Sequence, residues 1–457
     1  MTAPHAFDRT LSDWLDDARA PEIPRRVYEG AFADARRTRQ ARPIPARIAR
    51  RLPLSTTFDT PVATLRSRWA MLIVTGLVLL ALVAAAVFAA GSMRSIDRPI
   101  ELQGVFEPIG PLPGPREPGP GVTSAVALAD GSVLVVAGKE LARFDPATNA
   151  FRPVGSLGNE RASEATVRLH DGRVLIVGGV KDNYSPPRPE SYRAELYDPV
   201  TGTVARTGDT VEPRIASAAT VLRDGRVLVS GGEIGGATAS AEVYDPATGT
   251  FSVTGSMSRA RSDHSSVLLP DGRVLVVGGA GADLDASAEL YDPVTGAFTP
   301  TGPMAFPHSH FTATVLLDGR VLLAGGITGG PLPEQGHATG AAQIYDPATG
   351  RFSQVGSLVR PRTYHAAAAL ADGRVLVAGG LLEPGGRSNV TSNAQVFDPA
   401  TGLFSPAGAM SEARFNFQAV PLAEGRVLIV GHRWLNQLLP NQYDEEARIQ
   451  RSAEIFR

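Results

Sequence analysis

Basic side chains recur at one position of this 457-residue chain, and they are its best candidates for binding an anion. Seven similar segments each contain a glycine, at residues 131, 172, 225, 272, 319, 373 and 425, and the residues eleven positions earlier are Pro120, Arg161, Arg214, Arg261, His308, Arg362 and Arg414. Guanidinium groups bind carboxylates and sulfates through paired N–H donors. If rotation relates the segments, these side chains form a basic ring, which predicts binding of carboxylates or sulfated sugars.

The side chains eight residues before the same glycines are diverse. They are Thr123, Glu164, Ser217, His264, Phe311, His365 and Phe417. Diversity on a repeated frame indicates recognition. The predicted binding set therefore adds two histidines to the basic residues and comprises Arg161, Arg214, Arg261, His264, His308, Arg362, His365 and Arg414.

No metal, cofactor or catalytic residue is predicted. His264, His308, His310 and His365 come from three segments, and nothing in the sequence places an acid beside them, so they do not specify a metal site. The chain has no cysteine, which excludes disulfides and cysteine-ligated zinc. It has no GxSxG motif and no phosphate-binding loop, and the glycine-rich stretch at 325–330 is interpreted as a strand end followed by a loop.

A repeated hairpin must position these residues. It occurs as DGSVLVVAG at Asp130, DGRVLIVGG at Asp171, DGRVLVSGG at Asp224, DGRVLVVGG at Asp271, DGRVLLAGG at Asp318, DGRVLVAGG at Asp372 and EGRVLIVGH at Glu424. The steps between the hairpin glycines are 41, 53, 47, 47, 54 and 52 residues. Periods of this length are typical of propellers or solenoids.

Each repeat predicts four short strands. An apolar run precedes the Asp-Gly hairpin, for which we expect a type I′ turn with positive φ at both central residues. The strand VLVVGG follows, then SAELYDP, and then TGAFTPTG. In the YDPxTG segment we expect an Asx turn at Asp, a φ fixed by Pro and a left-handed Gly.

The Gly-Gly pair, the Tyr-Asp-Pro segment and the aromatic residue on the fourth strand together resemble the kelch repeat, over roughly residues 100–457. The aromatic residues are Phe251, Phe298, Phe352 and Phe404. The resemblance implies four-stranded blades around a central channel. The chain departs from many kelch repeats in having Phe in place of Trp, and Val204 in the second repeat.

The resemblance also leaves a structural role open for the arginines. Kelch repeats often carry a basic residue before the first strand, where it can bridge neighbouring blades without contacting a ligand. Copper radical oxidases share a kelch-like propeller but use a Tyr crosslinked to Cys, and that pair cannot form in this cysteine-free chain.

The two ends of the repeat region predict how the ring closes. Residues 452–457 match the third-strand segment at 287–291, so the last blade lacks a fourth strand, while residues 104–112 align with the fourth-strand segment at 296–304. We therefore predict an all-β, seven-bladed propeller over 104–457 that the N-terminal strand closes, which removes two exposed sheet edges.

The segment before the propeller predicts a membrane anchor. Residues 69–91 form an uncharged apolar run long enough to span a bilayer as a helix. Residues 1–68 hold 13 Arg, no Lys and 8 acidic residues, a net charge of +5, and are expected to form two short helices and a basic linker in the cytoplasm. A linker at 92–103 then leads to an extracytoplasmic propeller of net charge −7, which does not predict nucleic-acid binding.

The opposite faces of such a ring differ in their connections. The tight Asp-Gly and Asp-Pro turns share one face, for which we expect a position toward the membrane, and the other face collects long loops at 180–193, 327–340, 381–392 and 432–451. Variable loops on a rigid scaffold usually carry binding. The leading prediction is a membrane-anchored module that binds a protein or glycan and can relay occupancy to its cytoplasmic segment.

Two other functions stay open. Propellers also host enzymes, so a carbohydrate-active enzyme of lyase or epimerase type is the alternative prediction. A propeller that only supports oligomer assembly is the third.

Overall fold

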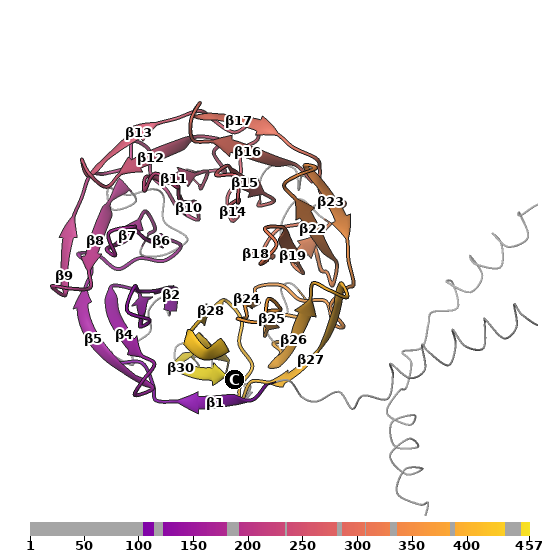
Figure 1. Ribbon diagram of the computed structural model, residues 1–457. Coiled ribbons are helices and arrows are strands. Elements are labelled where there is room, and N and C mark those ends of the chain that lie inside the picture. The colour runs from indigo at the N-terminus through magenta and orange to yellow at the C-terminus, as the bar shows by residue number, and fades with distance from the viewer. Residues whose placement is uncertain are drawn as a thin grey trace, which may run out of the picture. The chain divides into compact units, whose positions relative to one another are not determined.

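Seven four-stranded antiparallel sheets are arranged in a ring around a central axis in the computed structural model of the protein (Figure 1). The structure describes residues 104–113, 122–180, 192–233, 235–280, 286–306, 308–329, 336–383, 389–434 and 449–457. The predicted all-β, seven-bladed architecture is confirmed.

The strands of the seven blades follow the chain. Blades 1 to 3 comprise β2 (Val122–Ala127), β3 (Val133–Ala137), β4 (Glu140–Asp145) and β5 (Ala150–Ser156); β6 (Ala165–Arg168), β7 (Val174–Val177), β8 (Ala194–Asp198) and β9 (Thr203–Arg206); and β10 (Ala218–Val221), β11 (Val227–Ser230), β12 (Ala241–Asp245) and β13 (Thr250–Val253). Blades 4 to 6 comprise β14 (Ser265–Leu268), β15 (Val274–Val277), β16 (Ala288–Asp292) and β17 (Ala297–Pro300); β18 (Thr312–Val315), β19 (Val321–Ala324), β22 (Ala342–Asp346) and β23 (Arg351–Gln354); and β24 (Ala366–Ala369), β25 (Val375–Ala378), β26 (Asn393–Asp398) and β27 (Leu403–Ala409). Blade 7 comprises β28 (Phe417–Pro421), β29 (Val427–Trp434), β30 (Ile449–Phe456) and β1 (Phe106–Ile109). Two minor elements lie between these strands: the hairpin of β20 (Ile327–Thr328) and β21 (His337–Ala338), and the 3-10 turn η3 (Ala423–Gly425).

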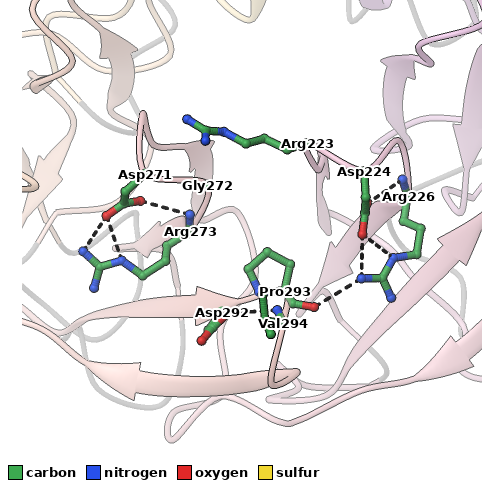
Figure 2. A pocket seen from close by; sticks show the side chains of 9 residues that line it. All are labelled: Arg223, Asp224, Arg226, Asp271, Gly272, Arg273, Asp292, Pro293 and Val294. Carbon is green, nitrogen blue, oxygen red and sulfur yellow. Dashed lines mark hydrogen bonds and ion pairs between the residues drawn. The ribbon is translucent and has the colours of Figure 1, made fainter.

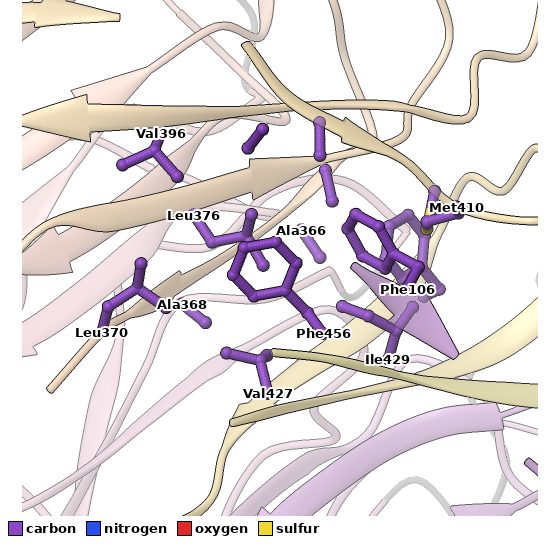
Figure 3. Close-up of a cluster of buried hydrophobic side chains, with 14 residues drawn as sticks. Phe106, Ala366, Ala368, Leu370, Leu376, Val396, Met410, Val427, Ile429 and Phe456 are labelled. Carbon is purple, nitrogen blue, oxygen red and sulfur yellow. The ribbon is translucent and has the colours of Figure 1, made fainter. Parts of the chain in front are cut away.

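The first strand of the propeller closes its last blade. β1 pairs antiparallel with β30, with Phe106 opposite Phe456, and the main chains of Val105 and Arg457 exchange two hydrogen bonds of 3.0 Å. The two phenylalanine rings are 5.0 Å apart and belong to the buried cluster between blades 6 and 7 (Figure 3). Closure by the N-terminal strand is therefore confirmed.

The core of the ring lies between blades. The second strand of every repeat is an apolar run, and in β7, β11, β15, β19 and β25 all four residues are buried because both faces pack against a neighbouring blade. Seven buried clusters, each drawn from two adjacent blades, occupy the seven interfaces of the described ring. Each blade is thus held by its neighbours on both sides.

The Asp-Gly hairpins differ in detail from the predicted type I′ turn. In blade 2 Gly172 has φ +91°, but Asp171 is not left-handed. The Gly172 N–H donates a hydrogen bond to the Leu169 carbonyl oxygen, and the Leu169 N–H donates one to the Arg173 carbonyl oxygen. This is a three-residue loop that ends in one left-handed glycine. The type I′ prediction was wrong for the six Asp-Gly hairpins, because this longer loop needs positive φ at one residue only. In blade 7 it holds, since Glu424 (φ +61°) and Gly425 (φ +72°) are both left-handed.

The Asp-Pro turns agree with the prediction and also join blades. In blade 2 the Asp198 carboxylate accepts a hydrogen bond from the Val200 N–H, and Gly202 is left-handed with φ +71°. The tyrosine before the turn reaches the preceding blade, as when the Tyr244 hydroxyl lies 2.8 Å from the Thr207 hydroxyl. We call the side with these turns and the Asp-Gly hairpins the turn face, and the opposite side the loop face.

The predicted segments at 1–68, 69–91 and 92–103 lie outside the described residues. Within the described part of the chain, no helix has the length and apolar character needed to cross a bilayer.

Candidate functional site

Five arginines recur at the loop-face end of the blades, as the sequence predicted, but they are buried. Each lies in the linker that enters the innermost strand of its blade, and their exposed fractions are 0–3 %. We call them the linker arginines: Arg161, Arg214, Arg261, Arg362 and Arg414. They contact their own blades, so they do not form an open basic surface.

In four blades a buried glutamate on the third strand neutralises the linker arginine. The ion pairs are Arg161–Glu195, Arg214–Glu242 at 2.8 Å, Arg261–Glu289 at 3.0 Å and Arg414–Glu454 at 2.9 Å. The second carboxylate oxygen of Glu289 accepts a hydrogen bond from the Ser258 N–H, so each acid also fixes the incoming linker. Removing one member of such a pair would leave an uncompensated buried charge.

The linker arginines also join neighbouring blades through their main chains. The guanidinium of Arg214 donates to the carbonyl oxygens of Gly231 and Ser240, both in its own blade. The main-chain carbonyl oxygen of Arg214 accepts a hydrogen bond of 2.7 Å from the Gly179 N–H of the preceding blade. A Cβ added at Gly178 would lie 2.1 Å from the same oxygen, which explains the Gly-Gly pair. The bridging role that the resemblance implied is therefore present.

These contacts decide how the predicted binding set can act. Burial of the linker arginines argues against direct contact with a large ligand, and their part in binding stays a prediction. His308 takes the arginine's place in blade 5, is 3 % exposed, and lies with its Nδ1 2.9 Å from the Gly325 carbonyl oxygen.

The two remaining predicted residues, His264 and His365, lie between blades. His264 Nε2 is 2.9 Å from the Ser230 hydroxyl, and His365 Nε2 is 3.1 Å from that of Thr312. Burial lowers the pKa of each imidazole to about 3, helped by the nearby linker arginines. Both residues are therefore neutral packing groups at physiological pH.

A different residue in the same linker carries the diversity at the channel mouth. Nine positions before the hairpin glycine, six blades place a non-glycine residue with φ between +48° and +58°. We call this set the mouth ring: Ser163, Ala216, Asp263, His310, Tyr364 and Asn416. These residues come one or two positions before the innermost strands β6, β10, β14, β18, β24 and β28, which encircle the channel in Figure 1.

Main-chain hydrogen bonds around the channel hold this unusual conformation. The Ala216 N–H donates to the Ser163 carbonyl oxygen at 2.9 Å, Asp263 donates to Ala216 at 3.0 Å, and Asn416 donates to Tyr364 at 2.9 Å. Non-glycine residues in left-handed backbone cost on the order of 1–3 kcal/mol and cluster at functional sites. The frame is repeated while its side chains differ, which is the pattern expected of a recognition surface.

Three consecutive members of the mouth ring bring titratable groups together. The His310 and Tyr364 rings are 4.4 Å apart, and Asp263 and His310 attract each other electrostatically. The Asp263 side chain is exposed, yet desolvation raises the pKa of its carboxyl, and desolvation also lowers the pKa of His310. Both groups are thereby biased toward their neutral forms.

Clefts recur on the turn face, and the hairpin arginines that line them are paired with aspartates. One, of about 390 Å³, lies between blades 3 and 4, and Figure 2 shows that each hairpin arginine in it is held by its own aspartate, Arg226 by Asp224 and Arg273 by Asp271. The Arg226 guanidinium also donates to the Pro293 carbonyl oxygen of the next blade. Similar clefts occur between blades 2 and 3 and between blades 5 and 6, so this feature belongs to the repeat.

Comparison with known families identifies one of the repeats. The kelch motif matches residues 214–258, which are the four strands of blade 3 with the linker arginine in front. The described chain is a kelch-repeat β-propeller.

The fold of this kelch propeller is also similar to solved structures. One is a fungal alcohol oxidase in complex with copper, with 18 % sequence identity, a TM-score of 0.62, and coverage of 77 % of this chain and 76 % of that one. At this identity the likeness concerns the fold alone. No curated protein sequence matches the chain. Among the described residues of the kelch propeller, no three His, Asp or Glu side chains gather as metal ligands would.

The sequence contains a signal for the buried ion pairs in the residues that recur together within a repeat. Arg before the first strand accompanies Glu on the third in blades 2, 3, 4 and 7, and His308 accompanies Gln343 in blade 5, whereas blade 6 combines Arg362 with Gln395. The recurrence of Arg with Glu in four repeats indicates direct contact. The mouth ring was missed because its shared property is a backbone conformation, which no single residue type reveals.

Proposed function

We propose that this kelch propeller binds a protein or glycan ligand at the loop-face mouth of its channel. The observation that carries the proposal is the mouth ring, a repeated left-handed frame with six differing side chains. Kelch propellers commonly bind proteins, and the long connections between second and third strands open on this same face. The turn face repeats the same hairpins and clefts and offers no comparable diversity.

The anchor and the placement outside the cytoplasm are part of the same proposal. The apolar run at 69–91 and the +5 charge of residues 1–68 support a single membrane span with the propeller outside the cytoplasm. A ligand on the loop face would then be met away from the membrane, and its occupancy can be relayed to the cytoplasmic segment.

A carbohydrate-active enzyme is the second candidate, and one observation favours it. Asp263 with a raised carboxyl pKa, His310 with a lowered imidazole pKa, and the phenol of Tyr364 are neighbours at the channel mouth. A carboxyl and an imidazole side by side, each shifted toward its neutral form, suit proton abstraction and return. This favours lyase or epimerase chemistry over hydrolysis by a metal.

A glycan and peptide array probed with the full-length protein tests both functions. The informative variant combines Asp263→Ala, Tyr364→Ala and Asn416→Ala; Ala216 already holds alanine in this frame, so folding should survive. The control combines Val200→Ala and Val294→Ala on the turn face, where both side chains are more than 90 % exposed. We expect the mouth variant to lose at least about tenfold in affinity, a loss of about 1.4 kcal/mol, while the control binds normally.

The outcomes separate the two candidates. Equal loss in both variants would overturn the mouth as the binding surface. If a bound glycan is also converted, which mass spectrometry of the incubated ligand would reveal, the enzyme replaces the binding module as the better description.

A further inference from the structure

Blade 6 contains a linker arginine without the acid that the other linker arginines have. In blades 2, 3, 4 and 7 the partner on the third strand is Glu, whereas on β26 the same position is Gln395. The Gln395 Oε1 accepts a hydrogen bond from the Val359 N–H at 2.9 Å, as the glutamates do from their linkers. The remaining amide nitrogen is a donor, so it cannot replace the second carboxylate oxygen.

The Arg362 guanidinium is consequently buried with unused donors. Nη1 bonds the carbonyl oxygens of Gly379 and Asn393 at 3.0 and 2.8 Å, but Nε and Nη2 have no partner, and the residue is 0 % exposed. Of the five linker arginines, only Arg362 has an unpartnered Nη2 within the described structure. A buried charge in this state calls for a counter-ion.

The neighbouring charges reinforce the deficit. Two residues before the linker arginine, blades 3 and 7 carry a second acid, with Glu212 3.9 Å from Arg214 and Glu412 3.7 Å from Arg414. Blade 6 carries Arg360 at this position, and repulsion from Arg360 adds to burial in lowering the pKa of Arg362 to about 10. The corner of blade 6 therefore holds two cations where blade 3 holds one cation and two anions.

Space for a ligand adjoins this corner. A pocket of about 500 Å³ is lined by Arg360, Arg362, Gln395 and the bulged outer strand β27 at Pro406 and Gly408. From this juxtaposition we propose that blade 6 carries a site for a small carboxylate, whose oxygens take the place of the missing glutamate beside Arg362. The inference is independent of the proposed function at the channel mouth.

A thermal-shift titration of the full-length protein tests the site. Sodium succinate and an acetylated glutamyl peptide are the probes, and sodium chloride at equal ionic strength is the reference. We expect Tm to rise by about 2 °C at ten times the Kd of the better probe, with no rise in chloride. A response to succinate identifies a free carboxylate as the ligand, and a response to the peptide alone identifies a protein side chain.

Two matched variants supply the decisive comparison. Gln395→Glu restores the arrangement of the other blades, so Tm should rise in buffer alone and the response to the probes should vanish. Gln343→Glu makes the same change in blade 5, where His308 replaces arginine, and should leave the response intact without raising Tm. No response to either probe, an equal response to chloride, or a response that survives in Gln395→Glu would overturn the proposal.

Discussion

At the scale of single residues, charge pairing explains why the most conspicuous basic side chains are scaffold. The Arg261–Glu289 pair is 3.0 Å long, and both side chains are at most 4 % exposed. An isolated buried guanidinium is unfavourable, but Glu289, the Ser287 hydroxyl and two carbonyl oxygens accept hydrogen bonds from Nη1 and Nη2 of Arg261. The proposed recognition surface is instead made by neighbours such as Tyr364, whose side chain stays partly accessible.

The buried pair in blade 4 gives a direct stability prediction. Glu289→Gln creates the arrangement of blade 6, with Arg259 in the position of Arg360, and should lower the free energy of unfolding by roughly 3 kcal/mol. Urea denaturation in carboxylate-free buffer measures the loss. The control Asp209→Asn breaks the exposed Arg206–Asp209 pair and should cost less than about 1 kcal/mol. Similar losses for both variants would contradict a structural role for the pair.

The inter-blade histidines predict acid sensitivity. Their folded pKa is about 3, below the unfolded value near 6.5, so the unfolded state binds protons first as pH falls. Each neutral histidine makes its full contribution to the free energy of unfolding above pH 6.5. Between pH 6.5 and 3 this contribution should fall by about 1.4 kcal/mol per pH unit for each histidine. Because Phe311 and Phe417 occupy the same repeat position, His264→Phe with His365→Phe is the matched variant. An unchanged slope in its pH titration would refute this assignment.

At the scale of the elements, local pattern predicted most of the blade. The positions of the hairpins and the Asp-Pro turns follow from short-range signals, the closing strand follows from the match of the two chain ends to the repeat, and the structure confirms them. The burial of Arg261 did not follow, because its partner Glu289 lies 28 residues away and only the register of the blade brings them together. The turn type was missed for a related reason, since loop length depends on the pairing of Leu169 with Arg173.

The Gly-Gly pair gives a graded prediction at this scale. Gly110→Ala should be neutral, because nothing lies near an added Cβ and its φ is ordinary; Gly202→Ala should cost about 1–3 kcal/mol, because φ is +71° in open space. Gly178→Ala adds a clash with the Arg214 carbonyl oxygen to a φ of +72° and should cost more than either. Thermal unfolding of the three variants measures the series. A Gly178→Ala variant as stable as Gly202→Ala would show that the blades are not locked together at this point.

At the scale of the whole molecule, the ring separates support from recognition. Seven inter-blade cores and the pairing of β1 with β30 fix the frame, and the turn face repeats similar clefts lined by paired hairpin arginines. The loop face holds the mouth ring, the long connections and the blade 6 pocket. The two faces thus differ in how far their side chains vary from blade to blade. In our proposal the partner is selected by the loop face, where the side chains vary more.

Site-specific photo-crosslinking in cells that produce the protein tests this separation most directly. A photoreactive residue at Asn416, exposed in the mouth ring, is compared with one at Val294, which is 93 % exposed on the turn face. The account predicts a defined adduct from position 416 that the Asp263→Ala and Tyr364→Ala changes abolish, and none from position 294. An adduct from position 294 with none from position 416 would place recognition on the turn face and contradict the account.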